Sequence, residues 1–404
     1  MKKKLIILIN QAGTYKGGAQ KRYLNLFSHL QKYSDEYYLL LNDSLFDSVF
    51  NDKILKSTKN VLHLHVKFER FVSQKETNIQ NNKTVKESKI TMCHSSIYNY
   101  LGALKYLVKC LYSCLCYSIE LNKLLNKNKF SSIYCVYNGG IWSWFLLRIK
   151  KIDYLYSYND ANFGLLKKSY IRMFGSDYFA LKYAKFIDCL SPALAEGLKK
   201  RFPEFYKDKF MVTPNSFIDY TQFKPIAQKE NWICFCSRLE ELKNPYLLIE
   251  AISLIRDKMK DYKVMIIGNG NEYIHLQEGI ENNNLGNIVQ LCGALESSEP
   301  IVSRSKIFVS VQQDNNYPSQ SLLEAMACEN AIIASDVGET RVLVTEKEGV
   351  LIPLSAQKLA EAILMLMENE TLCREKGKSA HNKATTEHTI EAFVTYFEQI
   401  MDKI

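Results

Sequence analysis

The chain has 404 residues, of which 47% are hydrophobic and 24% are charged. This composition is typical of a soluble globular protein, and it excludes intrinsic disorder, collagen, a coiled coil and a membrane bundle. A chain of this length is expected to form two or three domains. No apolar run reaches the roughly 18 residues needed to span a bilayer, and the short run at residues 5–9 is expected to form a first buried strand.

The eleven cysteines are an odd number, and the sequence contains no Cys-x-x-Cys pair. Several of them lie inside apolar segments, as in Ile233-Cys-Phe-Cys236. This pattern predicts reduced thiols in the core of a cytosolic protein, without disulfides and without a cysteine-bound metal.

Charge is distributed unevenly between the two halves of the chain. Residues 1–228 carry 35 Lys and Arg against 17 Asp and Glu, whereas residues 229–404 carry 17 against 26. This asymmetry predicts two domains with different partners, the basic one facing anionic lipid or a phosphorylated substrate. We expect no nucleic-acid partner, because no RNP signature, zinc spacing or recognition helix is found. A merely solvated basic surface is the alternative.

Short apolar runs alternate with helical patterns in the first half, which predicts an α/β domain with a parallel sheet. The expected strands are residues 5–9, 37–41, 61–65, 132–136, 153–157, 186–190 and 209–213. The expected helices are residues 20–32, 97–125, 141–149, 164–184 and 192–201.

The segment 74–89 interrupts this alternation, because it is polar and has almost no apolar residues. A loop of this length in a compact domain is usually functional or mobile. The helix that follows it carries Lys105 and Lys109 beside apolar positions. We expect this helix to be part of the core, with a membrane-surface helix as the alternative.

A second α/β cycle begins after Pro225. Its expected strands are residues 232–236, 263–267, 288–291, 307–311, 331–334 and 350–352. We therefore predict a Rossmann-like domain at 1–225, a second one at 226–385, and a terminal helix at 386–404 that can pack back on the first domain. Open α/β sheets bind ligands at the carboxyl ends of their strands, so two doubly wound domains facing a central cleft are expected.

Two basic side chains follow the first strand of the second domain. Arg238 comes directly after this strand, and Lys243 precedes a helix. Arginine offers a planar fork and lysine a point charge, and this pairing is common at phosphate groups. Surface charge is the alternative interpretation.

Glycine turns and a carboxylate complete the candidate site. Gly17 and Gly18 precede a helix, where backbone amides can approach an anion, and Gly268-Asn-Gly270 ends a strand. A plain turn is the alternative in both cases. Glu324 lies among apolar residues of an amphipathic helix, where a charge needs a partner such as a ribose diol, and an ordinary helix-surface glutamate is the alternative.

These elements, in this order, resemble the GT-B glycosyltransferases, specifically the large retaining family four of the group 1 type. The likeness is strongest over residues 232–353. There Ser-Arg-Leu…Lys, Val-Met-Ile-Ile-Gly-Asn-Gly, Ser-Leu-Leu-Glu-Ala-Met-Ala and Ala-Ile-Ile-Ala-Ser-Asp-Val-Gly-Glu occur at the family's spacing.

The resemblance implies a role for each matching residue. Arg238 and Lys243 match the pair that neutralises the donor diphosphate, and Glu324 matches the glutamate that binds the nucleotide ribose. The remaining donor-binding residues implied by the resemblance are Gly17, Gly18, Gly268, Ser319, Gln320 and Ser321.

The chain departs from the family pattern at two positions. Asn316 stands where the family has a first glutamate, and Gln312 or Asp314 are the alternatives for that role. Asn159 stands near the place of the family's first-domain histidine. We list Asn316 and Asn159 as candidate catalytic residues beside Arg238 and Lys243.

The expected function is transfer of a hexose or N-acetylhexosamine from a nucleotide sugar, a UDP-sugar, to a lipid-linked or polysaccharide acceptor of a surface glycan, with retention. No Asp-x-Asp pair occurs, so we expect no metal and no cofactor at the donor site. The enzyme is expected to be cytoplasmic and peripheral on an anionic membrane. A non-catalytic glycan- or nucleotide-binding relative and a nucleotide-sugar epimerase are the alternatives.

Overall fold

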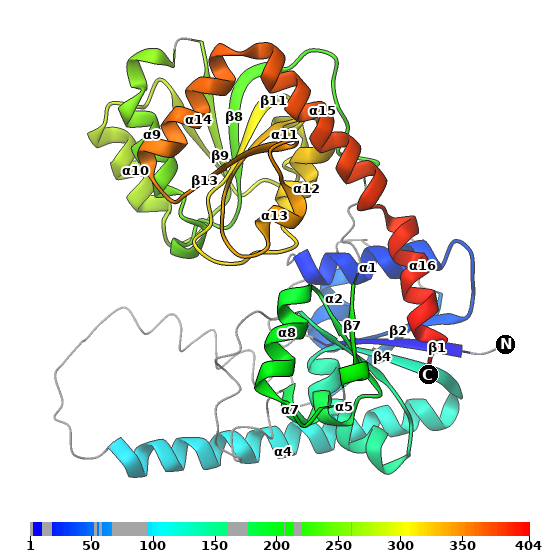
Figure 1. Ribbon diagram of the computed structural model, residues 1–404. Helices are drawn as coiled ribbons and strands as arrows, with labels where there is room; N and C mark the ends of the chain where they lie inside the picture. Colours follow the sequence, from blue (N-terminus) through cyan, green and yellow to red (C-terminus); the bar gives the residue numbers. More distant parts are fainter. Residues whose placement is uncertain are drawn as a thin grey trace. The chain divides into compact units, whose positions relative to one another are not determined.

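The computed structural model describes residues 3–9, 18–51, 55, 59–66, 95–159, 177–205, 207–213, 220–259 and 261–404. The chain divides into two compact units (Figure 1). Unit 1 consists of Met1–Pro214 with Val394–Ile404, and unit 2 consists of Asn215–Phe393. The predicted polar loop at 74–89 and Gly17 lie outside the described residues.

Unit 1 contains a seven-stranded sheet with the order β3-β2-β1-β4-β5-β6-β7, and all its neighbouring strands are parallel. The strands are β1 (Lys3–Ile9), β2 (Tyr37–Asn42), β3 (Val61–Leu64), β4 (Phe130–Tyr137), β5 (Leu155–Tyr158), β6 (Phe186–Cys189) and β7 (Phe210–Val212). The helices are α1 (Gly18–Leu30), α2 (Asp43–Asn51), α4 (Ser95–Lys127), α5 (Asn138–Ile149), α7 (Asp177–Tyr183), α8 (Pro192–Arg201) and α16 (Ile390–Met401).

The central strand β1 shows why the sheet is parallel and covered by helices. Its residues Leu5–Ile9 are all inaccessible to solvent. A strand that is apolar at every position, rather than at alternate ones, must be buried on both faces. The helical crossovers between parallel strands provide this cover.

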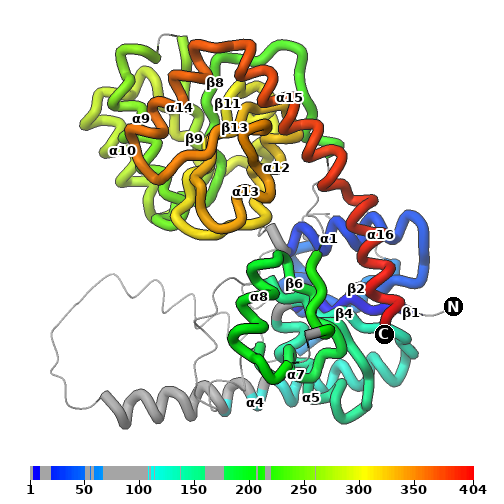
Figure 2. The backbone as a smooth tube through the Cα atoms, in the orientation of Figure 1, coloured from blue at the N-terminus to red at the C-terminus, as the bar shows by residue number. Residues whose placement is uncertain are grey.

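The C-terminal helix α16 packs on the sheet of unit 1 beside the start of the chain (Figure 2). The ring of Phe397 is buried against Tyr37 and Tyr134, with ring centroids 6.2 and 5.0 Å away. Asp402 forms an ion pair with Lys4, with Oδ1 2.6 Å from Nζ. Residues separated by almost the whole sequence therefore share one core.

Unit 2 contains a six-stranded parallel sheet with the order β10-β9-β8-β11-β12-β13. The strands are β8 (Glu230–Cys236), β9 (Lys263–Ile267), β10 (Val289–Gly293), β11 (Ser305–Ser310), β12 (Ala331–Ser335) and β13 (Gly349–Ile352). The helices are α9 (Tyr246–Leu254), α10 (Tyr273–Asn282), α11 (Glu299–Val302), α12 (Gln320–Ala327), α13 (Thr340–Leu343), α14 (Ala356–Glu368) and α15 (Glu370–Glu387).

The sheet of unit 2 contributes side chains to two separate hydrophobic cores, one on each of its faces. Alternate residues of a strand point to opposite faces. Ile307 and Val309 of β11 therefore join the core under α9, α10 and α14, whereas Phe308 joins the core under α12 and α15. Figure 1 shows the sheet between these two helical layers.

The predicted α/β class and the two Rossmann-like domains are confirmed. Each predicted strand is found with its ends shifted by no more than two residues. The first part of the predicted helix at 164–184 lies outside the described residues, and its described part is α7. None of the helices in the described part of the chain is long and apolar enough to cross a membrane.

Candidate functional site

The carboxyl edge of unit 2 carries a loop that is held by direct contact between two stretches of backbone. The amide of Ser237 donates to the carbonyl of Ile267 at 3.1 Å, and the amide of Leu239 donates to the carbonyl of Asn269 at 3.0 Å. A Cβ atom on Gly268 would collide with the Ser237 carbonyl oxygen, and one on Gly270 would collide with that of Leu239. The glycine turn after β9 thus fixes the loop that contains Arg238.

Arg238 lies just before a short 3-10 turn, Glu241–Lys243, and Lys243 is the last residue of that turn. The Arg238 side chain is exposed, and its Nη1 donates to Glu240 Oε1 at 2.6 Å. Lys243 is half-buried, and its Nζ has no hydrogen-bond or ion-pair partner among the residues that the structure describes. The two cations therefore belong to one short segment, as the sequence predicted, although only Lys243 reaches into a pocket.

The pKa of Lys243 is lowered to about 8. Burial is the largest cause, the positive charge of Arg238 lowers it further, and the carboxylate of Glu240 acts in the opposite direction. A half-buried ammonium group beside a second cation is an unfavourable arrangement. Such an arrangement favours the binding of an anion, which would compensate both charges.

A small, open pocket lies between the carboxyl ends of β8 and β11. These neighbouring strands mark the point where the strand order of the sheet reverses, which is where doubly wound sheets bind ligands. The polar residues that line it are Ser237, Lys243, Ser310, Gln312, Asn316, Ser319 and Ser321. The remaining lining residues are Phe235, Cys236, Val309 and Val311.

Helix α12 begins at this pocket. Its N-cap residue Ser319 is extended at ψ 114°, and no side chain caps the helix. The amides of a helix's first turn have no partner within the helix and carry a partial positive charge. The first amides of α12 are therefore available to an anion that binds in the pocket lined by Lys243.

Glu324 lies one turn into α12 and is half-buried, while Leu322, Leu323, Ala325 and Met326 around it are buried. This agrees with the sequence pattern. Arg238, Gly268, Gln320 and Glu324 are not among the residues that line the pocket.

The structure distinguishes the three candidates for the missing first glutamate. Asn316 and Gln312 both line the pocket. Gln312 is buried, with its Oε1 accepting from Ser310 at 3.1 Å and its carbonyl oxygen accepting from Ser335 at 2.7 Å. Asp314 is exposed and binds the amide of its neighbour Asn315 at 2.7 Å.

Asn315 is a structural residue that the sequence interpretation missed. Its Oδ1 accepts from the amides of Tyr317 and Glu339 at 3.3 and 3.2 Å, and its Nδ2 donates to Glu339 Oε2 at 3.2 Å. Gly338, at φ 52°, lets the chain approach the Asn315 side chain. The Val-Gly-Glu motif after β12 was the available signal, because it holds the loop that carries Asn316.

Asn159, the candidate of unit 1, follows β5 and lies beside a buried polar network. Its Nδ2 donates to Ser157 Oγ at 3.0 Å and to Tyr23 Oη at 3.5 Å. Tyr23 and Ser157 are 2.5 Å apart, and Tyr23 is 3.4 Å from Tyr134. Asn159 is thus oriented by its neighbours at the carboxyl edge of the sheet, and one of them, Tyr23, lies on α1, the helix that Gly18 begins.

The centre of this network is Asp188, which is buried on β6. Its carboxylate accepts from Tyr134 at 2.6 Å, from Tyr396 of α16 at 2.6 Å and from Thr213 at 3.0 Å. Burial raises the pKa of Asp188, and these three hydrogen bonds oppose that shift. The network ties α16 to the sheet and was not foreseen, because Tyr396 and Asp188 are 208 residues apart.

Comparison with known proteins agrees with this architecture. The whole chain superposes on the crystal structure of Anabaena HepE in complex with UDP, with a TM-score of 0.74, 14% identity and complete coverage of both chains. The protein therefore has the GT-B fold. Residues 217–383, which make up most of unit 2, match the family model of glycosyl transferases group 1.

Two curated enzymes are similar to parts of the chain. A poly(ribitol-phosphate) alpha-N-acetylglucosaminyltransferase of Staphylococcus aureus is 28% identical over 46% of this chain and 39% of its own length. The GalNAc-alpha-(1->4)-GalNAc-alpha-(1->3)-diNAcBac-PP-undecaprenol alpha-1,4-N-acetyl-D-galactosaminyltransferase of Campylobacter jejuni is 25% identical over 49% of this chain and 55% of its own length. The chain thus matches roughly half the length of these relatives or less.

Replacing Gly268 by alanine should destabilise unit 2. Gly268 adopts φ 143°, and the added methyl group would collide with the Ser237 carbonyl oxygen, so we expect a loss of roughly 2 kcal/mol or more in the free energy of unfolding. Denaturant-induced unfolding measures this loss. Gly286→Ala is the matched control, because its Cβ would meet no atom within 4 Å. Equal stability of the two variants would contradict the proposed backbone contact.

Proposed function

We propose that the protein is a glycosyltransferase that moves a hexose or N-acetylhexosamine from a nucleotide sugar, a UDP-sugar, to a lipid-linked or polysaccharide acceptor, with retention of configuration. The observation that carries this proposal is the pocket of unit 2. It joins a half-buried lysine to the uncapped start of α12 at the switch point of a domain that matches the glycosyl transferases group 1 family model.

The charges of the site support a role in breaking a bond between a sugar and a phosphate. When that bond breaks, negative charge develops on the departing nucleoside diphosphate. Lys243 and the first amides of α12 are already positioned to stabilise this charge. Preorganised groups of this kind contribute a few kcal/mol each to lowering the barrier. We assign Arg238 to the same diphosphate from the exposed side of the loop.

The remaining donor contacts are assigned by position. Glu324, one turn into α12, would accept hydrogen bonds from the nucleotide ribose. Asn316 and Gln312 line the pocket and would face the sugar, so either can replace the missing glutamate. Asn159 of unit 1 is assigned to the acceptor side. The choice of UDP is supported by the UDP complex of Anabaena HepE, and the acceptor class by the names of the Staphylococcus and Campylobacter relatives.

Incubation with a panel of UDP-sugars, with and without lipid-linked acceptor, tests the activity. We expect acceptor-dependent release of UDP. Lys243→Ala and Arg238→Ala should each lower kcat/KM by about 100-fold or more, which is the scale for losing one group that stabilises developing charge. Lys378→Ala, which removes an exposed lysine of α15, should retain full activity. An epimerised donor without acceptor, or turnover unchanged in both variants, would contradict the proposal.

The affinity for UDP should depend on pH through Lys243. In the free protein this lysine is protonated below its pKa of about 8 and loses its charge above it. The dissociation constant should therefore stay constant up to about pH 7.5, then rise by up to about tenfold per pH unit towards pH 9. Lys243→Arg, which stays charged, should abolish this rise. Titration calorimetry from pH 7 to pH 9 measures the dissociation constant of UDP. If it changes with pH in the same way for the wild type and for Lys243→Arg, Lys243 is not the titrating group.

We further propose that the enzyme acts peripherally on an anionic membrane, the inner face of the cytoplasmic membrane, where lipid-linked acceptors are found. Lys83, Lys86 and Lys89 of the predicted basic loop lie outside the described residues. Support comes instead from α4, whose sequence carries four lysines against one glutamate.

Helix α4 has an exposed apolar stripe opposite its buried face. Val108, Leu111, Leu115 and Ile119 recur at helical spacing, and each exposes between 43 and 58% of its surface. Cys114, Tyr117, Leu121 and Leu125 of the same helix are buried in unit 1. A helix that is basic and carries an exposed apolar stripe has the features of a membrane-surface helix. The buried face agrees with the core helix expected from the sequence, and the exposed stripe supports the proposed contact with a membrane surface.

Leu115→Gln should weaken binding to vesicles that contain anionic lipid, because it removes apolar surface from the centre of the stripe. Leu254→Gln is the matched control, since Leu115 and Leu254 both expose 57% of their surface and Leu254 lies in unit 2. Co-sedimentation with vesicles at low and high salt measures the binding, which salt should also reduce. If both variants bind like the wild type, or if neutral vesicles bind equally well, the stripe is not a membrane contact.

A further inference from the structure

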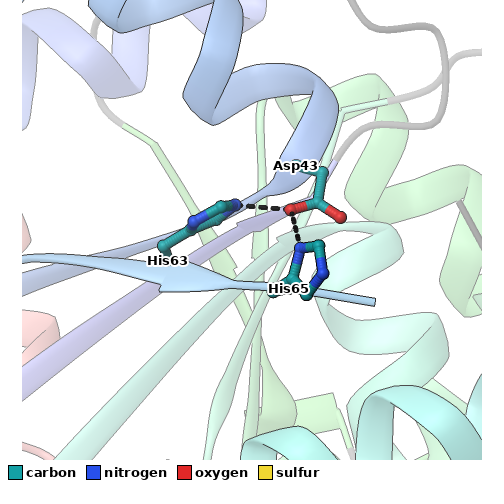
Figure 3. A group of neighbouring side chains, drawn as sticks. All are labelled: Asp43, His63 and His65. Carbon is teal, nitrogen blue, oxygen red and sulfur yellow. Dashed lines mark hydrogen bonds and ion pairs between the residues drawn. The ribbon is translucent and has the colours of Figure 1, made fainter. Parts of the chain in front are cut away.

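Two histidines and an aspartate of unit 1 converge at the carboxyl ends of β2 and β3 (Figure 3). Asp43 is the first residue of α2 and directly follows β2. His63 lies on β3, and His65 lies one residue beyond its end. Residues two positions apart on an extended chain point to the same side, so the imidazoles of His63 and His65 lie on one face. The parallel register, which pairs Asn42 with Leu64, brings that face beside Asp43.

Each of the two imidazoles directs one ring nitrogen to the same carboxylate oxygen of Asp43. Asp43 Oδ1 lies 2.5 Å from His63 Nε2 and 2.9 Å from His65 Nδ1. All three atoms lie within 4.8 Å of one another. Figure 3 shows both rings turned towards the same carboxylate oxygen.

The surroundings hold two of these groups in place. Asp43 is 3% exposed, and its second oxygen, Oδ2, accepts from the amide of Val66 at 3.2 Å. The ring of Phe46 stacks on His63 at 4.0 Å with an interplanar angle of 10°. A ligand whose orientation is fixed by an outer hydrogen bond loses little freedom when an ion binds. The His65 side chain is 52% exposed, so the point of convergence is open to solvent.

We propose that Asp43, His63 and His65 form a binding site for a divalent transition-metal ion, with Zn²⁺ as the best match to the ligand set. Two imidazole nitrogens and one carboxylate oxygen suit Zn²⁺ and related ions, whereas Mg²⁺ prefers oxygen ligands alone. Three protein ligands leave a fourth tetrahedral position for water. The site shares no residue with the pocket of unit 2.

The geometry requires only a small adjustment to accept the ion. Tetrahedral zinc at 2.0–2.1 Å from each ligand places the ligand atoms roughly 3.3 Å apart. The separation of Asp43 Oδ1 from His63 Nε2 would therefore widen by about 0.8 Å, and its separation from His65 Nδ1 by about 0.4 Å. Rotation of the exposed His65 ring can supply the smaller of these movements, and the larger one requires a shift of the His63 ring relative to Asp43.

An ion held here would join the start of α2 to the end of β3. The unfolded chain does not hold the three side chains together, so the ion would bind the folded protein preferentially. Binding should therefore raise the free energy of unfolding of unit 1. This effect provides a measurement that is independent of glycosyl transfer.

Calorimetric titration of the full-length, reduced and chelator-treated protein with ZnCl₂ tests the proposal. We expect binding to one site that includes His65, and about 100-fold or greater weakening at that site in His65→Gln. Glutamine keeps an N–H that can donate to Asp43, so the fold should persist. MgCl₂ should give no binding at this site. In thermal unfolding, Zn²⁺ should raise the Tm of the wild type more than that of His65→Gln.

His275→Gln is the matched control. His275 also contacts one carboxylate, Glu272, through Nδ1 at 3.1 Å, and its side chain is 53% exposed, but the described residues offer it no third ligand. This variant should bind Zn²⁺ as the wild type does. The proposal is overturned if the wild type shows no Zn²⁺ binding, or if His65→Gln binds as tightly as His275→Gln, and the cluster is then a hydrogen-bonded triad only.

Discussion

Burial of both faces of each parallel sheet is the constraint on which the rest of this structure depends. In unit 1 the central strand β1 has no solvent-accessible side chain from Leu5 to Ile9, and in unit 2 alternate residues of β11 enter two different cores. Polar and charged groups are therefore disfavoured on the faces of the sheets, where each needs buried hydrogen-bond partners, as Asp188 of β6 has. They gather at the carboxyl ends of the strands, where loops and helix starts provide backbone amides and access to solvent.

The two units use this edge in different ways. In unit 2 the edge forms an open pocket, in which Lys243 and the start of α12 leave positive charge without an anionic partner among the lining residues. In unit 1 Asp188 lies in a closed network, where Tyr134, Tyr396 and Thr213 satisfy its carboxylate. The first arrangement is suited to binding an anion, and the second fixes α16 and orients the neighbours of Asn159. The Asp43 cluster differs from both, because Asp43 is buried whereas His65 is exposed, and this combination fits the proposed ion site.

Glycine at a few positions makes the pocket of unit 2 possible. Gly268 and Gly270 allow the turn after β9 to touch the backbone of the loop that carries Arg238, and Gly338 allows the loop after β12 to approach Asn315. In each case the absent side chain lets two loops come close enough to hydrogen-bond. The positions of Lys243 and Asn316 therefore depend on contacts made by residues that have no chemical role of their own.

The sequence by itself determined the α/β class, the position of each strand and the local pairing of Arg238 with Lys243, because these follow from apolar runs and from residues close in the chain. It also placed Glu324 in an apolar helix environment. The tertiary structure alone decided which polar groups meet in unit 1: Tyr396 with Asp188, and Asp43 with two histidines. It also set the lowered pKa of Lys243. Parallel strands are joined by long crossovers, so residues that meet at a sheet edge are distant in sequence, and no local pattern records their contact.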